Sequence, residues 1–198
     1  MLLITLFLSV VILSSTSDAS SFNDFCVADL NGPESPSGYN CKPPNTVTTD
    51  NFVSNLRDRP SAFVTEIPGL NGQGISLARA ELVPGGMFGM HTHPGASELI
   101  LVEEGEITVG FMRSEEAYVK TLIVGNVMLI PRGLLHFVLN TGKENCTFTA
   151  FYSSENPTFQ FVGQQLFGTN VPSYIIAQTT PLDLAEVTKQ KARFGGTG

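Results

Sequence analysis

Between residues 74 and 153 the chain is a succession of short segments in which apolar and polar residues alternate. Glycine, proline, serine or asparagine closes each segment, as in GISLARAEL, SELILVEEG, EITVGFMRS, NVMLIPRG and CTFTAFYSS. Alternation with a period of two is typical of half-buried β-strands, and the region shows no helical periodicity. Several strands at such close spacing favour a β-sandwich or a β-barrel. The sequence therefore predicts an all-β-dominant fold.

The N-terminal end of the chain has a different character. Leu2 to Leu13 is an unbroken run of apolar and small residues, too short to span a bilayer. Ser17 and Ala19 then supply the small residues that signal peptidase requires before its cut. We therefore expect residues 1–19 to be a secretory signal peptide; a buried N-terminal helix is the alternative.

The C-terminal end is expected to be helical. Residues 171–178 read as one short helix. A second helix is expected to have Thr180 as its N-cap and Pro181 as its first helical residue, and to end before Gly195-Gly196. We assign residues 166–198 to a C-terminal helical segment.

Composition limits the class of protein. Of the 198 residues, 42% are hydrophobic and 15% are charged, and the formal net charge is -7. A chain of this length and composition favours one compact domain and argues against disorder. Because the negative charge does not attract polyanions, nucleic acid is not expected as a partner. Beyond the N-terminal run no segment is apolar enough for a membrane span, so no membrane partner is expected.

The three cysteines fit the oxidising compartment that secretion implies. Cys26 and Cys41 flank a segment rich in glycine, proline and serine, and a bridge between them would pin residues 20–60. The entropy model values the closing of such a loop at roughly 3 kcal/mol. Cys146 is left over in an alternating strand, where we expect a buried free thiol. Asn145 begins an Asn-Cys-Thr sequon and is a candidate N-glycosylation site, whose occupancy the sequence leaves open.

All three histidines of the chain lie in two strand segments. His91 and His93 would project from one face of a strand, and Glu98 can return to that side after a Pro-Gly turn. His136 lies in a second apolar strand. Hydrogen-bonded core histidines are the alternative, but this combination favours a metal site. Three imidazoles and a carboxylate suit Mn, Fe, Ni, Cu or Zn and leave positions open on an octahedral ion.

Two motifs enclose these residues: Gly85-x5-His91-x-His93-x4-Glu98-x6-Gly105 and Gly125-x5-Pro131-x-Gly133-x2-His136-x3-Asn140. They resemble the two cupin boxes of plant germins and germin-like proteins. DFCVADL, SSENP and LFG elsewhere in the chain resemble the same family. HTHPGASE and the terminal GGTG are similar to the subgroup that includes auxin-binding germin-like proteins.

The resemblance implies a single jelly-roll β-barrel of the cupin type, expected at residues 61–165, followed by the C-terminal helices. It implies a secreted protein of the extracellular space, the apoplast and the cell wall. It also implies a homo-oligomer, a hexamer built as a trimer of dimers, to which the terminal helices contribute. Carried over by position, it implies Mn(II) bound by His91, His93, Glu98 and His136, and a disulfide between Cys26 and Cys41.

The chain departs from the germins that oxidise oxalate. Where those proteins carry asparagines before the first metal histidine, this chain has Phe88 and Ala78, which cannot donate a side-chain hydrogen bond to a dicarboxylate. We therefore do not expect oxalate oxidase activity. The segment between Asn51 and Gly74 is shorter than in relatives, which bears on assembly or access to the cavity.

Three functions are consistent with the resemblance. The first, which we take as the primary prediction, is a Mn superoxide dismutase, since superoxide needs only an open coordination position. Asn140 then either hydrogen-bonds near the metal or serves as a turn residue before Thr141-Gly142. The second is a binding protein for auxin or another small carboxylate, which the apolar Phe88 favours. The third is a structural cell-wall protein with a role in defence.

Overall fold

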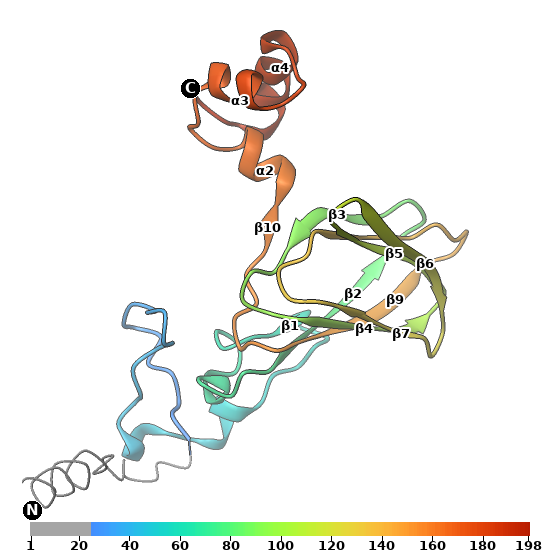
Figure 1. Cartoon of the computed structure of the whole chain (residues 1–198). Coiled ribbons are helices and arrows are strands. Elements are labelled where there is room, and N and C mark those ends of the chain that lie inside the picture. The colour runs from blue at the N-terminus through green and yellow to red at the C-terminus, as the bar shows by residue number, and fades with distance from the viewer. Residues whose placement is uncertain (1–24) are drawn as a thin grey trace, which may run out of the picture.

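The structure, a computed structural model, describes residues 25–198, so the expected signal peptide at 1–19 lies outside the described residues. Within the described part the strands form two five-stranded sheets that face each other as a jelly-roll barrel (Figure 1). The order in one sheet is β1 (Ser61–Ala62), β2 (Ser76–Leu82), β9 (Cys146–Tyr152), β4 (Glu98–Glu104) and β7 (Val127–Ile130). The order in the other is β10 (Gln160–Phe161), β3 (Met87–Thr92), β8 (His136–Leu139), β5 (Glu106–Arg113) and β6 (Glu116–Ile123).

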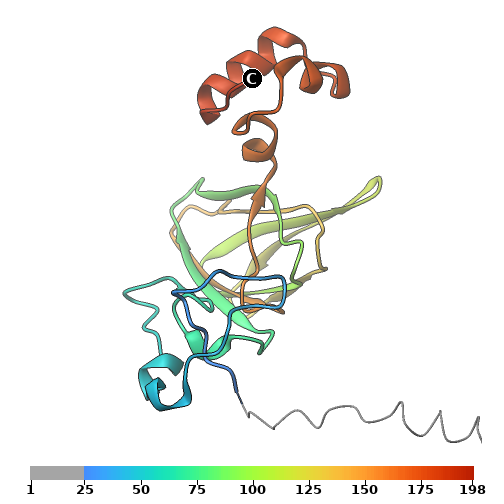
Figure 2. The same ribbon diagram turned by 90° about the vertical axis from the view of Figure 1, so that its left-hand side faces the viewer.

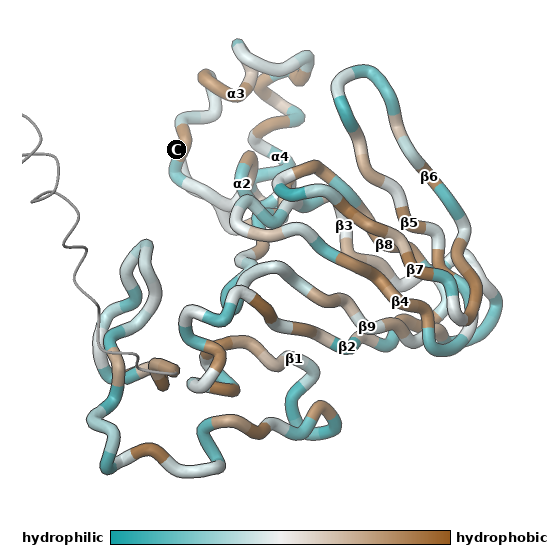
Figure 3. The backbone as a smooth tube through the Cα atoms, turned by 60° about the horizontal axis from the view of Figure 1, so that its bottom comes forward, coloured by the Kyte–Doolittle hydropathy of each residue, from teal (hydrophilic) through white to brown (hydrophobic). Residues whose placement is uncertain are grey.

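The predicted all-β fold is confirmed, and β4 shows how the alternation produces it. Ile100 and Val102 point into the barrel and are 0% and 1% exposed, whereas Leu99 points outward and is 44% exposed. Each buried aliphatic side chain contributes roughly 1.5–3 kcal/mol to folding. Apolar residues are frequent along the strands, whereas the turn between β5 and β6 is polar (Figure 3). β1 and β10 escape prediction because each has only 2 residues, too few to show an alternation.

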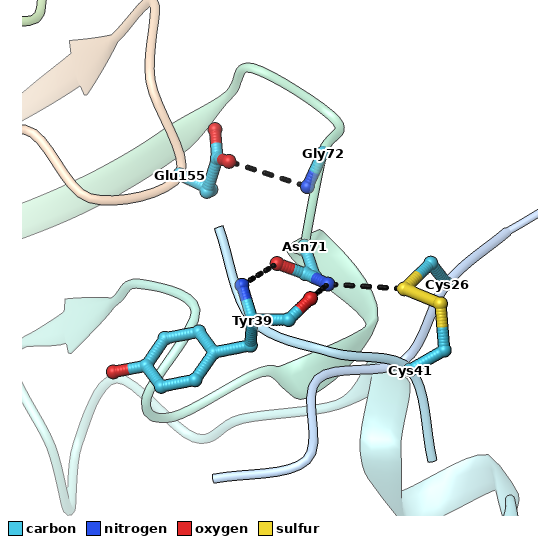
Figure 4. Close-up of a disulfide and its surroundings, with 6 residues drawn as sticks. All are labelled: Cys26, Tyr39, Cys41, Asn71, Gly72 and Glu155. Atoms are coloured by element: carbon cyan, nitrogen blue, oxygen red, sulfur yellow. Dashed lines mark hydrogen bonds between the residues drawn. A yellow bond between two sulfur atoms is a disulfide. The ribbon is translucent and has the colours of Figure 1, made fainter. Parts of the chain in front are cut away.

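A disulfide closes a loop within the N-terminal segment, and one buried amide connects this segment to the residues that lead into the barrel. Cys26 and Cys41 form the disulfide, and next to it Asn71 follows the 3-10 helix η4 (Pro68–Leu70) that leads toward β2. Asn71 accepts a hydrogen bond from Tyr39 N (3.0 Å) and donates to Tyr39 O (2.9 Å) and to Cys26 Sγ (3.1 Å) (Figure 4). Two further 3-10 helices, η2 (Pro44–Thr46) and η3 (Thr49–Phe52), complete this region.

The C-terminal helices stand away from the barrel at the end of β10 (Figures 1 and 2). They are α2 (Val162–Phe167), α3 (Ser173–Thr179) and α4 (Leu184–Phe194). The helical segment was expected from residue 166, whereas α2 begins at Val162. In the described part of the chain, no helix combines the length and the apolar character that crossing a membrane requires.

The predicted N-cap of the last helix is wrong. Thr180 instead ends α3, because its backbone N–H and its hydroxyl both donate to Ile176 O. Asp183 is the N-cap of α4 and accepts a hydrogen bond from Glu186 N at 2.8 Å. The predicted end is confirmed, since Gly195 adopts the left-handed conformation that favours glycine at a helix C-terminus.

Candidate metal centre

The histidines and the glutamate that the sequence predicted as ligands meet between the two sheets. His91 lies in β3 and His93 directly after it, and His91 is paired in register with His136, the first residue of β8. Glu98, the first residue of β4, approaches from the opposite sheet. All of them are at most 4% exposed, and one ligand atom from each lies within 4.8 Å of the others.

Backbone carbonyls determine which nitrogen each imidazole presents. The Nδ1 atoms of His91, His93 and His136 lie 2.7, 2.5 and 2.8 Å from the carbonyl oxygens of Gly89, Thr158 and Leu134. Because a carbonyl oxygen only accepts, each Nδ1 carries the proton and donates. Each Nε2 therefore keeps its lone pair, which is the form that binds a metal ion.

The atoms that face the centre of the cluster have no hydrogen-bond partner within the described chain. These atoms are His93 Nε2, His136 Nε2 and Glu98 Oε2. Glu98 Oε2 is 3.0 Å from His136 Nε2 and 3.5 Å from His93 Nε2. Burial of polar atoms without partners is costly, so this arrangement needs a further group. A transition-metal ion fits, since three imidazole nitrogens and a carboxylate oxygen are ligands that such ions prefer.

Burial also favours the neutral form of His91 and His93. It is the main cause that lowers the pKa of His91 from 6.5 to about 4, and the neighbouring His136 lowers it further. Burial likewise lowers the pKa of His93, against the opposing effect of its hydrogen bond to Thr158 O. Metal ions bind the neutral imidazole, so the site is ready for a metal at neutral pH.

Comparisons with known proteins agree with this geometry. The Cupin family model matches residues 43–188. The chain is 44% identical over 196 residues to a germin-like protein of Morus alba, a match that covers 92% of this chain and 94% of that protein. The chain belongs to the germin-like proteins of the cupin family.

This germin-like protein is also similar to proteins with more specific names. It is 43% identical over 205 residues to the auxin-binding protein ABP19a of Prunus persica, a match that covers 97% of this chain and 98% of that protein. A solved structure of oxalate oxidase superposes with a TM-score of 0.80 at 33% identity, covering 88% of this chain and 96% of that one. The jelly-roll fold and the resemblance to the subgroup with auxin-binding members are thereby confirmed.

A small cavity adjoins the metal ligands inside the barrel of this germin-like protein. Its volume is about 40 Å³, room for a few water-sized molecules. Ala78 and Phe88, which stand where the oxalate-oxidising germins carry asparagines, both line it. The full lining is Ala78, Ala80, Phe88, His91, Glu98, Val138, Phe148, Ala150, Tyr152 and Phe159.

Tyr152 is a site residue that the sequence reasoning missed. It is 5% exposed, lies opposite Glu98 in the pairing of β4 with β9, and has its ring 5.0 Å from the ring of His93. Burial raises the pKa of Tyr152, and the neighbouring charge of Glu98 raises that pKa further. In the sequence Tyr152 looks like any inward residue of an alternating strand, and only the strand register places it beside Glu98.

Two other predicted residues lie on strand ends. Asn140 is 1% exposed and its amide donates to Leu82 O and Glu144 O and accepts from Gly142 N, which matches the turn role that the sequence left open. Asn145 is exposed and its Nδ2 donates to Glu81 Oε1 at 2.8 Å. The remaining cysteine, Cys146, is a buried free thiol as predicted.

Proposed function

We propose that this germin-like protein is a secreted, manganese-binding superoxide dismutase. The observation that carries the proposal is the cavity of about 40 Å³ beside the metal ligands. A diatomic anion fits a space of this size, whereas an aromatic hormone does not enter it without rearrangement of the walls. Superoxide also needs no recognition pocket of hydrogen-bond donors, and the walls of this cavity are mostly apolar.

His91, His93, Glu98 and His136 would hold Mn(II). A bound manganese ion would supply one-electron exchange, so that two superoxide ions and two protons yield O2 and H2O2. The carbonyls of Gly89, Thr158 and Leu134 orient the imidazoles, and the apolar walls restrict the cavity to small molecules. Mn(II) binds most weakly in the divalent series, so its selection would depend on supply and geometry.

Oxalate oxidation is not part of this proposal. Phe88 and Ala78 line the cavity and offer no hydrogen-bond donor to a dicarboxylate. The similarity to oxalate oxidase therefore supports a shared fold and a related ligand set for this chain.

Auxin or small-carboxylate binding is the second candidate function. Relatives that are 42–43% identical to this chain are named auxin-binding proteins, and Phe88 and Phe159 would contribute aromatic walls. In that case the carboxylate would bind the metal and the cavity would have to widen. A structural protein of the wall, with a role in defence, is the candidate that remains if neither superoxide nor auxin is a ligand.

We further propose secretion to the apoplast and cell wall and assembly into a hexamer, a trimer of dimers. The apolar N-terminal run and the disulfide of Cys26 with Cys41 support secretion. For assembly, Phe151, Leu99 and Leu129 are neighbours on adjacent strands and remain 40–53% exposed on the outer face of the sheet. The projecting α2–α4 segment would extend over a neighbouring subunit (Figure 1). Asn145 is the proposed glycosylation site.

The test is to measure metal content and superoxide dismutation on protein secreted by a plant host, before and after chelation. The expected result is manganese bound to the protein, with activity that chelation abolishes and manganese restores. Glu98→Gln should lose most of the metal and the activity, whereas the matched surface variant Glu115→Gln should keep both. Manganese without activity would refute the dismutase proposal, and calorimetric titration with indole acetate would then test the auxin candidate.

A further inference from the structure

The cavity beside the metal ligands has very few polar groups. Its lining includes the polar side chains His91, Glu98 and Tyr152, and the first two belong to the metal cluster. Every other lining side chain is aliphatic or phenylalanine. Tyr152 thus provides the one polar side chain of the described lining that is not itself a candidate metal ligand.

Packing holds the ring of Tyr152 in place. The ring lies edge-on to Phe63 at a centroid distance of 5.9 Å and to His93 at 5.0 Å. Phe159 lies 6.1 Å away on the cavity side, and the two rings are again edge to face. A ring enclosed in this way has little freedom, so its hydroxyl has a defined position beside the metal cluster.

An anion that enters an apolar cavity loses its hydration and needs hydrogen-bond donors in return. The imidazole N–H groups of the cluster are already used by backbone carbonyls. An ionised carboxylate such as that of Glu98 can accept hydrogen bonds but cannot donate one. Among the described lining side chains, the hydroxyl of Tyr152 is therefore the group that can donate to an anion inside the cavity.

We propose that Tyr152 is the hydrogen-bond donor that receives a small oxyanion or pseudohalide in this cavity. The inference rests on the proposed function for the identity of the natural anion, superoxide, but not for the binding geometry. Tyr152 would hold the anion beside the metal cluster, and the small volume of the cavity would favour anions of two or three atoms over larger ones. Apart from the candidate metal ligands, the rest of the cavity wall is aliphatic or phenylalanine and offers no further hydrogen-bond donor.

The test uses azide as the probe anion and manganese-loaded full-length protein. Azide affinity is measured by isothermal titration calorimetry, per bound metal ion, for the wild type, Tyr152→Phe and Tyr118→Phe. Tyr118 is the matched control, since it lies in β6, is 43% exposed, and donates its hydroxyl proton to Glu116 Oε2. Tyr152→Phe should weaken azide binding by about 10- to 100-fold, the effect of losing a hydrogen bond to a charged group. Tyr118→Phe should leave it unchanged.

Equal azide affinity for Tyr152→Phe and wild type would overturn the proposal. A Tyr152→Phe protein that no longer retains manganese would also overturn it, because the hydroxyl would then act on Glu98 and not on the anion. The superoxide assay separates this inference from the proposed function. Azide binding that depends on Tyr152, in a wild type without dismutase activity, would support the anion site and refute only the dismutase.

Discussion

Thr158 is held in a backbone conformation that costs energy, and its replacement by glycine should stabilise the protein. Its φ is 47°, in the left-handed region that β-branched residues rarely adopt. For an L-residue this conformation costs roughly 1–2 kcal/mol, whereas glycine adopts it freely. Glycine loses more backbone freedom on folding, which takes back roughly 0.5–1 kcal/mol. Thr158→Gly should therefore raise the free energy of unfolding by about 0.5–1 kcal/mol.

The assay is thermal and urea unfolding of the metal-free protein at one fixed concentration. A gain of this size corresponds to a rise of roughly 1–4 °C in melting temperature for a domain of this length. Thr158→Ala is the matched control, since alanine keeps a Cβ atom and should show no such gain. Ser114→Gly, with φ of 49° in the turn between β5 and β6, should give a comparable gain away from the histidines.

The metal site should tolerate Thr158→Gly, because His93 donates to the main-chain carbonyl of residue 158. Manganese content is therefore expected to remain at the wild-type level. A destabilised Thr158→Gly protein next to a stabilised Ser114→Gly protein would refute the reasoning. It would show that the Thr158 side chain contributes more than its backbone conformation costs.

Three further predictions concern pH, metal and core. Because the pKa of His91 is lowered from 6.5 to about 4, the unfolded metal-free chain binds more protons than the folded one between these values. The free energy of unfolding of the metal-free protein should therefore fall by on the order of 3 kcal/mol as the pH is lowered from 6.5 to 4, as measured by urea unfolding at each pH. A free energy of unfolding that does not change over this pH range would contradict the prediction. Chelation of the metal-loaded protein should lower its melting temperature, because His93 Nε2, His136 Nε2 and Glu98 Oε2 lose their partner; an unchanged calorimetric scan would argue against bound metal. Ile100→Ala, at a position 0% exposed, should cost about 2–5 kcal/mol in urea unfolding, whereas Ile123→Ala, 58% exposed on edge strand β6, should cost far less.

The sequence alone was sufficient for most of the strands and for the ligand set. The alternation around Ile100 and Val102 is a local property, and it predicts which side chains enter the core. The ligands could be recognised because His91, His93, Glu98 and His136 occur in two spaced motifs of a chain with no other histidine. The disulfide of Cys26 with Cys41 could be predicted because the two cysteines flank a turn-rich segment and their positions match those of the family.

The helix caps show where local patterns are insufficient. Thr180 and Asp183 are both good N-cap residues, and Pro181 made the first the natural choice. Which of the two residues caps α4 depends on where the preceding helix, α3, ends. Since α3 continues to Thr179 and Ile176 O accepts from Thr180, only Asp183 remained free to cap α4.

What the sequence determined by itself is the kind of site: a histidine-rich metal cluster in a β-barrel, without the asparagines of the oxalate-oxidising germins. The tertiary structure decided how that site is completed. It placed Glu98 opposite Tyr152, brought the Thr158 carbonyl to His93, and left a cavity of about 40 Å³. These features depend on strand register and on contacts between distant segments, which no local pattern encodes because each results from the packing of both sheets at once.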